Sequence, residues 1–237
     1  CTSSSLDNRV CKARCRNLHQ RVQGNDLPLQ ALSFIKIVFK GKYSGSKTLS
    51  FKIVPAVVTG IKAKADTTSV KLTWAKAGGA TGYRIYRYDT KSKKWVKVKS
   101  STKETSYTVK DLKAGTAYTF AVKPYYKKGD TVIWGKYTQF ETATAPATPK
   151  LAYKNGVKSV TLSWDKVSGA TGYVIYYSTE KKGEYKKVVA TKGTSYTVNN
   201  LTAGKTVYFK IRAYKKTANG NVYSAYSTPA TTKPLYF

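Results

Sequence analysis

The side chains best suited to chemistry are concentrated in the first twenty residues of the chain. All three cysteines, Cys1, Cys11 and Cys15, lie there together with His19, the only histidine. Cys11, Cys15 and His19 follow one another at intervals of four, which would align them on one face of a helix. A structural zinc site normally needs four ligands, and a fourth is not evident, so we expect no metal site. A Cys11–Cys15 disulfide and free thiols are the alternatives.

The rest of the chain, residues 55–237, lacks the residue combinations that common hydrolytic enzymes use. It contains no histidine and no cysteine, which excludes Ser-His-Asp and Cys-His mechanisms there. Its nine acids form no repeated pair, and neither GxxxxGK[ST] nor GxGxxG occurs. We therefore expect no catalytic residues and no cofactor, and we predict that the chain is not an enzyme. The nine are Asp66, Asp89, Glu104, Asp111, Asp130, Glu141, Asp165, Glu180 and Glu184.

This part of the chain is an internal repeat. SVKLTWAKAGGATGYRIYR at 69–87 and SVTLSWDKVSGATGYVIYY at 159–177 match at twelve of nineteen positions, at an offset of 90. SYTVKDLKAGTAYTF at 106–120 matches SYTVNNLTAGKTVYF at 195–209, at an offset of 89. A period near 90 is too long for a solenoid repeat and fits one small domain.

Each copy has the pattern of short β-strands. Apolar and polar residues alternate around Trp74 and Trp164, and again around Tyr83 and Tyr173. β-Branched and aromatic residues are dense, and Gly, Asn and Asp separate the runs. We predict an all-β chain of two tandem, seven-stranded β-sandwiches, 55–144 and 145–237, preceded by an irregular extension.

The order of these residues resembles the fibronectin type III family. Trp74 is followed by GYRIYR at 82–87 and YTVKDLKAGTAYTFAV at 107–122. The resemblance implies that the Trp fills the core, and that Tyr118 makes a tyrosine corner whose hydroxyl bonds back to the chain. The second copy has Val207 at the corner, followed by Tyr208, so either the bond is lost or Tyr208 makes it. The implied structural residues are Trp74, Tyr83, Leu112, Tyr118, Trp164, Tyr173 and Leu201.

The first 54 residues differ from the repeat. Residues 1–35 hold four of the seven arginines and show no alternation, and we interpret them as an atypical, disordered or non-native segment. Residues 36–54 resemble the last strands of a bacterial immunoglobulin-like repeat, on the matches of Tyr43, Phe51 and Ile53. Because the chain begins with Cys1 and contains no methionine, we interpret it as part of a larger protein.

Two features are candidates for binding. If Tyr83 and Ile85 face the core, the alternation of the strand directs Tyr86, Tyr88 and Tyr176 toward solvent. Trp95 and Tyr185 occupy equivalent hairpin positions in the two copies. Such rings could stack on sugars or simply cover the sheet. Lys128-Gly129-Asp130 resembles the short basic-Gly-acidic motif of some integrin ligands, although Gly-Asp is also an ordinary hairpin turn.

The charge points to polyanionic partners. The net charge is +32, of which each module carries about +12, mostly from lysine. Anionic cell-wall polymers, acidic glycans and surface proteins are the expected partners, although lysines also serve simply to keep a sheet soluble. Arginine is scarce and no helix is predicted, which argues against sequence-specific nucleic-acid binding. No apolar run is long enough to insert in a membrane, and we expect monomeric modules.

The linker suggests an array of modules. ETATAPATPK at 141–150 is rich in Thr, Ala and Pro, and PATTKP at 229–234 has the same character. We predict a non-catalytic, extracellular spacer or adhesion module of a bacterial surface or secreted protein. The alternative is an accessory region of a secreted enzyme that degrades polysaccharide or cell wall and whose catalytic domain lies elsewhere.

Overall fold

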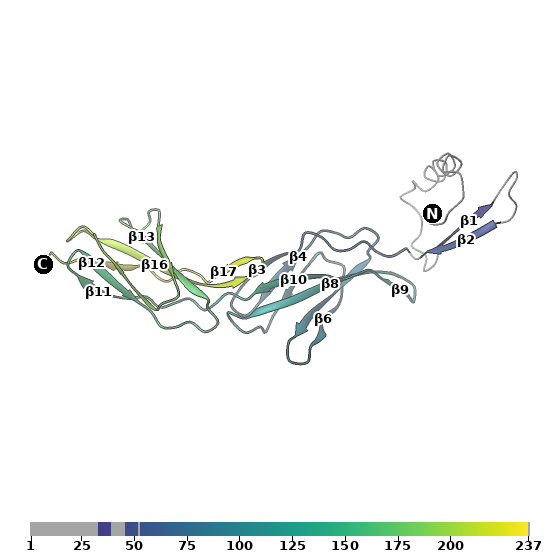
Figure 1. The fold of residues 1–237 in the computed structure, drawn as a ribbon, viewed down its shortest axis with the longest axis horizontal. Coiled ribbons are helices and arrows are strands. Elements are labelled where there is room, and N and C mark those ends of the chain that lie inside the picture. The colour runs from purple at the N-terminus through teal and green to yellow at the C-terminus, as the bar shows by residue number, and fades with distance from the viewer. Residues whose placement is uncertain (1–32, 39–45, 52, 237) are drawn as a thin grey trace, which may run out of the picture. The chain divides into compact units, whose positions relative to one another are not determined.

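The computed structural model describes residues 33–38, 46–51 and 53–236 (Figure 1). The chain divides into two units, with the boundary between Val54 and Pro55. The first unit contains an antiparallel hairpin of β1 (Ser33–Val38) and β2 (Ser46–Phe51), in which Ser33 pairs with Phe51. The predicted strands of 36–54 overlap this hairpin. Cys1, Cys11, Cys15, His19 and Tyr43 lie outside the described residues.

The second unit begins with a sandwich of two antiparallel sheets, the first module. One sheet has the order β3-β4-β7, and the other has the order β10-β8-β5-β6 with β9 also paired to β8. Both β9 and β10 pair with β8, so this module has one strand more than the seven predicted. The strands are β3 (Lys62–Ala65), β4 (Val70–Thr73), β5 (Gly82–Asp89), β6 (Lys94–Thr102), β7 (Ser106–Val109), β8 (Ala117–Lys128), β9 (Thr131–Trp134) and β10 (Thr138–Ala143).

The β5–β6 hairpin is closed by the side chain of Asp89. Its carboxylate accepts hydrogen bonds from the Ser92 hydroxyl at 2.7 Å and from the Lys91 amide at 3.1 Å. These hydrogen bonds favour the ionised carboxylate and hold the pKa of Asp89 below its ordinary value. The hydrogen bond from Ser92 has the larger effect and that from Lys91 the next largest. The turn ends at Lys93, whose φ of 53° lies in the left-handed region.

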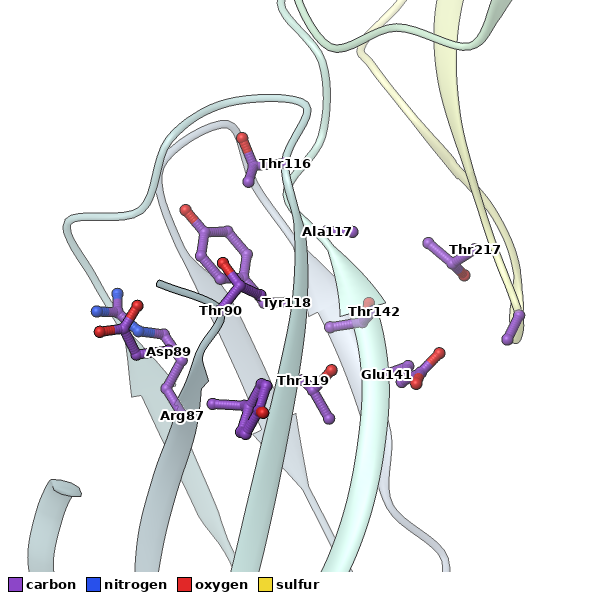
Figure 2. Close-up of a pocket in the computed structure, with 12 residues that line it drawn as sticks. Arg87, Asp89, Thr90, Thr116, Ala117, Tyr118, Thr119, Glu141, Thr142 and Thr217 are labelled. Carbon is purple, nitrogen blue, oxygen red and sulfur yellow. The ribbon is translucent and has the colours of Figure 1, made fainter. Parts of the chain in front are cut away.

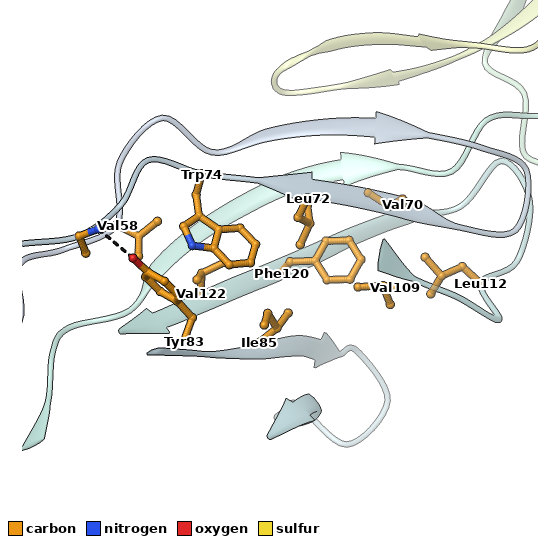
Figure 3. Packing of buried hydrophobic residues seen from close by; sticks show 11 residues of the cluster. Val58, Val70, Leu72, Trp74, Tyr83, Ile85, Val109, Leu112, Phe120 and Val122 are labelled. Carbon is orange, nitrogen blue, oxygen red and sulfur yellow. Dashed lines mark hydrogen bonds between the residues drawn. The ribbon is translucent and has the colours of Figure 1, made fainter. Parts of the chain in front are cut away.

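The first core lies between the two sheets (Figure 3). Alternate residues of β4, β5 and β8 point inward, among them Leu72, Ile85 and Phe120, which have no exposed surface. Trp74 meets the ring of Tyr83 edge to face, with 5.4 Å between centroids, and the Tyr83 hydroxyl accepts a hydrogen bond from the Ala77 amide at 2.9 Å. The buried cluster comprises Val58, Val70, Leu72, Trp74, Ala77, Tyr83, Ile85, Val109, Leu112, Phe120 and Val122.

The turn between β7 and β8 is fixed by Tyr118. Its hydroxyl accepts a hydrogen bond from the Lys113 amide at 2.9 Å, which is the corner bond that the resemblance implied. Asp111 adopts a left-handed φ of 56°, a conformation that aspartate tolerates better than most residues, and the adjoining Leu112 is buried.

The second module repeats this plan. Its sheets have the orders β11-β12-β15 and β14-β13-β16-β17, with β18 also paired to β16. The described residues contain no helix, and so none long and apolar enough to cross a membrane. The prediction of an all-β fold with two tandem sandwiches is confirmed. The strands are β11 (Ala152–Gly156), β12 (Ser159–Ser163), β13 (Gly172–Ser178), β14 (Lys186–Thr191), β15 (Ser195–Val198), β16 (Val207–Thr217), β17 (Gly220–Tyr223) and β18 (Ala230–Thr232).

The second core is equivalent to the first, but its corner differs. Trp164 meets Tyr173 at 5.3 Å, and the Tyr173 hydroxyl accepts a hydrogen bond from the Val167 amide at 2.8 Å. Leu201 is buried, and Val207, at the place of Tyr118, is buried as well. Among the described residues the Tyr208 hydroxyl has no hydrogen-bond partner, so of the two alternatives the corner bond is lost.

The predicted linkers are shorter than their composition indicated. Residues 141–143 belong to β10, and the Ala145 amide donates to the Asp66 carbonyl at 3.0 Å, so the first half of 141–150 is part of the first module. Likewise, residues 230–232 form β18, and the Gly204 amide donates to the Pro234 carbonyl at 2.9 Å. A Thr/Ala/Pro-rich composition therefore occurs in the last strand of each module and in the residues that follow it, as well as in a linker.

The corner bond predicts a difference between matched tyrosines. Replacing Tyr118→Phe removes the acceptor of the Lys113 amide and should lower the free energy of unfolding by about 1 kcal/mol. Tyr208→Phe removes a hydroxyl without such a bond and should cost less. Urea denaturation of both variants measures the two changes, and equal losses would argue against the corner as a stabilising bond.

The turn at Asp89 predicts a pH-dependent contribution. The fold lowers the pKa of Asp89, so the ionised carboxylate stabilises the folded state at any pH above the pKa of the unfolded chain. This stabilisation is lost as the pH falls through the lower pKa of the folded state. Asp89→Asn should therefore be less stable than the parent at neutral pH. The difference should narrow once pH falls below the ordinary value of 3.8. Asp130→Asn, on another hairpin, is the control for loss of one negative charge.

Candidate functional site

Metal-binding side chains do not cluster among the residues that the structure describes. These residues contain no group of three or more His, Cys, Asp or Glu side chains placed to hold a metal ion. A hollow is lined by first-module residues that include Arg87, Asp89, Tyr118 and Glu141, and by Thr217 and Ala218 of the second module (Figure 2). The hollow contains two carboxylates, those of Asp89 and Glu141. The Asp89 carboxylate is hydrogen-bonded within the β5–β6 turn, so the two do not form a free general acid–base pair.

Outward-facing rings of the first module gather around Trp95. Tyr88 and Trp95 are opposite each other on β5 and β6, with their ring centroids 5.3 Å apart. The ring of Tyr137, between β9 and β10, lies 5.8 Å from Trp95. Two of the predicted contact residues are thus brought together, with a third ring that sequence reasoning missed. We call Tyr88, Trp95 and Tyr137 the Trp95 cluster.

A second group on the same module surrounds Trp134. The guanidinium carbon of Arg84 lies 4.4 Å from the centre of the Trp134 ring, and Lys123 Nζ lies 5.3 Å from it. The Tyr125 ring is 5.2 Å away. The predicted residue Tyr86 pairs with Ala121 between these two groups and makes no ring contact among the described residues.

In the second module the predicted residue Tyr176 lies against Arg212. The Arg212 guanidinium carbon is 3.8 Å from the centre of the Tyr223 ring, 4.8 Å from Tyr226 and 5.2 Å from Tyr176. Arg212 Nη2 also donates a hydrogen bond to the Tyr176 hydroxyl at 2.6 Å. We call Tyr176, Arg212, Tyr223 and Tyr226 the Arg212 cluster.

Tyr185 does not share the surroundings of Trp95, although the sequence aligns the two. Lys210 Nζ lies 3.9 Å from the centre of the Tyr185 ring, and the Tyr185 hydroxyl donates to the Lys181 carbonyl at 3.2 Å. Burial is the main cause of a raised pKa at Tyr185. The hairpin loops have different lengths in the two copies, so equivalent aromatic positions meet different partners.

The Lys128-Gly129-Asp130 segment forms the tip of the β8–β9 hairpin. Lys128 pairs with Thr131, which leaves Gly129 and Asp130 as the two turn residues, and all three motif residues are exposed. Gly129 has a φ of 55°, which a two-residue hairpin turn requires and which glycine adopts without strain. The turn geometry therefore explains the tripeptide without a receptor, and its role in recognition stays a prediction.

The missed members of these clusters carry a signal in the repeat. Lys123, Trp134 and Tyr137 correspond, at the offset of 89, to Arg212, Tyr223 and Tyr226. Both copies thus place a cation on the same strand and aromatic rings at the same two positions of the following segment. A comparison of outward positions between the copies would have found them.

Comparison with known proteins agrees with the fold. The chain is 29% identical over 195 residues to exoglucanase B of Cellulomonas fimi, which covers 75% of this chain and 16% of that protein. It is 29% identical over 173 residues to chitinase A1 of Niallia circulans, covering 66% of this chain and 22% of that protein. The chain thus spans less than a quarter of each of these two relatives.

A solved structure that the chain resembles is a segment of two fibronectin type III domains from chicken tenascin. It covers 76% of this chain and 98% of its own length, at 20% identity and a TM-score of 0.40. The family model for the fibronectin type III domain matches residues 56–141 and 144–232, which together are most of the chain. The chain belongs to the fibronectin type III family, with two tandem domains.

Proposed function

We propose that the chain is a non-catalytic, extracellular spacer and contact region of a bacterial secreted or surface protein. The observation that carries this proposal is the pair of sheet faces on which outward aromatic rings are held against cations. Both modules have such a face, around Trp134 in the first and Arg212 in the second. Neither face places a carboxylate pair, a histidine or a thiol beside these rings, so the surfaces suit contact better than chemistry.

The charge supports a polyanionic partner for these surfaces. A net charge of +32 attracts anionic cell-wall polymers, acidic glycans or acidic protein surfaces over a distance of about one Debye length, roughly 8 Å at physiological salt. Lysine rather than arginine supplies most of this charge, which favours diffuse attraction over base-specific recognition of nucleic acid. The modules act as monomers in this proposal.

A second candidate function is favoured by the relatives. Exoglucanase B and chitinase A1 bear the names of polysaccharide-degrading enzymes, and this chain matches only a small part of each. The two domains would then be accessory modules of a secreted enzyme whose catalytic domain lies outside this sequence. Both candidates place the modules outside the cell and assign the chemistry to another domain.

The contact proposal predicts salt-dependent retention on an anionic polymer. The full chain should bind immobilised heparin at low salt, and its affinity should fall steeply as salt screens the lysines. Retention on an uncharged agarose column measures the background. Affinity for heparin that does not change between low and high salt would contradict charge-driven contact.

The accessory-module proposal predicts a selective effect of deletion. If the parent protein hydrolyses a polysaccharide, removing residues 55–232 should lower the rate on the insoluble polymer and leave the rate on a soluble oligosaccharide unchanged. A matched parent, in which these residues are replaced by a Gly/Ser linker, tests whether length alone suffices. Equal losses on both substrates would show that the deletion damages the catalytic domain instead.

A further inference from the structure

The Arg212 cluster is built rigidly from three strands and the segment that follows one of them. Tyr176 comes from β13, Arg212 from β16 and Tyr223 from β17, whereas Tyr226 lies in the segment between β17 and β18. Tyr223 and Tyr226 are 37% and 46% exposed, so both rings present surface to solvent while they lie against the guanidinium.

Two buried serines tie the backbone beside these rings to β16. Ser224 follows Tyr223, and its hydroxyl accepts a hydrogen bond from the Ala213 amide at 3.0 Å. Ser227 follows Tyr226, and its hydroxyl accepts from the Ile211 amide at 3.1 Å. The amides of both serines also donate back to β16, at 2.9 and 2.8 Å. Because the backbone on either side of Arg212 is fixed, a ligand need not order it on binding.

The guanidinium of Arg212 has unused donors. It carries five N–H groups, of which one binds the Tyr176 hydroxyl and one, on Nε, is buried without a partner. Nη1 is not among the buried atoms and has no hydrogen-bond partner among the described residues. The neighbours of the charge are rings and a hydroxyl rather than a carboxylate, so its positive charge is not neutralised.

A second cation extends the face. Lys210 precedes Arg212 by two residues on β16, so both side chains are on the same side of the sheet, roughly 7 Å apart along the strand. Lys210 lies over the Tyr185 ring and is paired across the sheet with Tyr176. Lys210 and Arg212 thus occupy consecutive outward positions of β16, and the rings of Tyr176 and Tyr185 lie beside them.

This arrangement matches a chain of sugars that carry carboxylates. The C–H faces of sugar rings pack on aromatic rings, while a carboxylate accepts charge-assisted hydrogen bonds from a guanidinium. We propose that the outward face of the second module binds a uronic-acid polysaccharide, with Arg212 on a carboxylate and Tyr223 and Tyr226 against the sugar. The inference rests on the proposed contact function and gives it a specific ligand class and site.

Other polyanions fit this face less well. A polyol-phosphate polymer has no sugar ring in its backbone, so the exposed tyrosines would have no partner. Nucleic acid is held chiefly by many phosphate contacts, whereas this face concentrates one arginine among three rings. Single-stranded DNA is nevertheless a necessary arm of the test, because bases also stack on aromatic rings.

The test measures binding of the full chain to polygalacturonate at physiological salt by isothermal titration calorimetry. Arg212→Gln should weaken binding roughly tenfold, as expected for loss of a charged hydrogen bond. Lys154→Gln is the matched control, because it removes one positive charge from exposed β11 in the other sheet, and it should change binding less than twofold. Equal losses in the two variants would overturn the site.

A second variant guards against misfolding of Arg212→Gln. Tyr223→Leu keeps apolar cover on the guanidinium but removes the flat ring, and it should weaken binding several-fold with an unchanged melting temperature. Unaltered binding by Tyr223→Leu would overturn the role of the ring. Methyl-esterified polygalacturonate has the same rings without charge and should not bind, and binding equal to that of the acid would also overturn the proposal.

Two further ligands separate this inference from the proposed function. If dextran sulfate, a polyanion without uronic acid, is bound in a salt-dependent way but polygalacturonate is not, the uronate site is wrong and the general contact function stands. If neither is bound, both fail. Single-stranded DNA that binds with the same dependence on Arg212 would replace the polysaccharide with a nucleic acid as the ligand.

Discussion

The packing of a tryptophan against a tied-down tyrosine sets the geometry of each module. Trp74 and Trp164 meet Tyr83 and Tyr173 edge to face in the core, and each tyrosine hydroxyl is bonded to a backbone amide six residues earlier in the chain. The hydrogen bond holds the tyrosine in the core, and so fixes which face of β5 or β13 points inward. Because a strand alternates its faces, burying these tyrosines directs Tyr86 and Tyr176 outward. The outer surface is thus determined from within.

The sequence was a good guide wherever alternation governs. The two sandwiches, most of their strands and the division between Trp74-type and Tyr86-type positions follow from a period of two. The guide failed at Tyr137 and Tyr226, which lie between paired strands. Their positions depend on hydrogen bonds such as those of Ser224 and Ser227 to β16, which no periodicity records. The same reason applies where the chain leaves each module. There, hydrogen bonds from the Ala145 amide to the Asp66 carbonyl and from the Gly204 amide to the Pro234 carbonyl fix residues whose composition suggests a linker.

The two modules close the same turn by different means. In the first, the Tyr118 hydroxyl bonds to the Lys113 amide. In the second, Val207 buries an apolar side chain there, and the Gly204 amide in the turn donates a hydrogen bond to the Pro234 carbonyl. The first module has the equivalent of the Gly204 bond, from Gly115 to Ala145, so the tyrosine adds to a shared closure rather than replacing it.

A face so rich in aromatic rings could serve only to cover the sheet, but the charge of Arg212 argues against that explanation. Taking a cation out of water costs free energy that a carboxylate partner usually offsets. Here three rings supply part of that compensation, and they leave the net charge in place. Apolar side chains would cover β16 without this cost. An arginine held among rings with free terminal donors is therefore better suited to an anion that arrives from solvent, while the surrounding lysines draw that anion in from a distance.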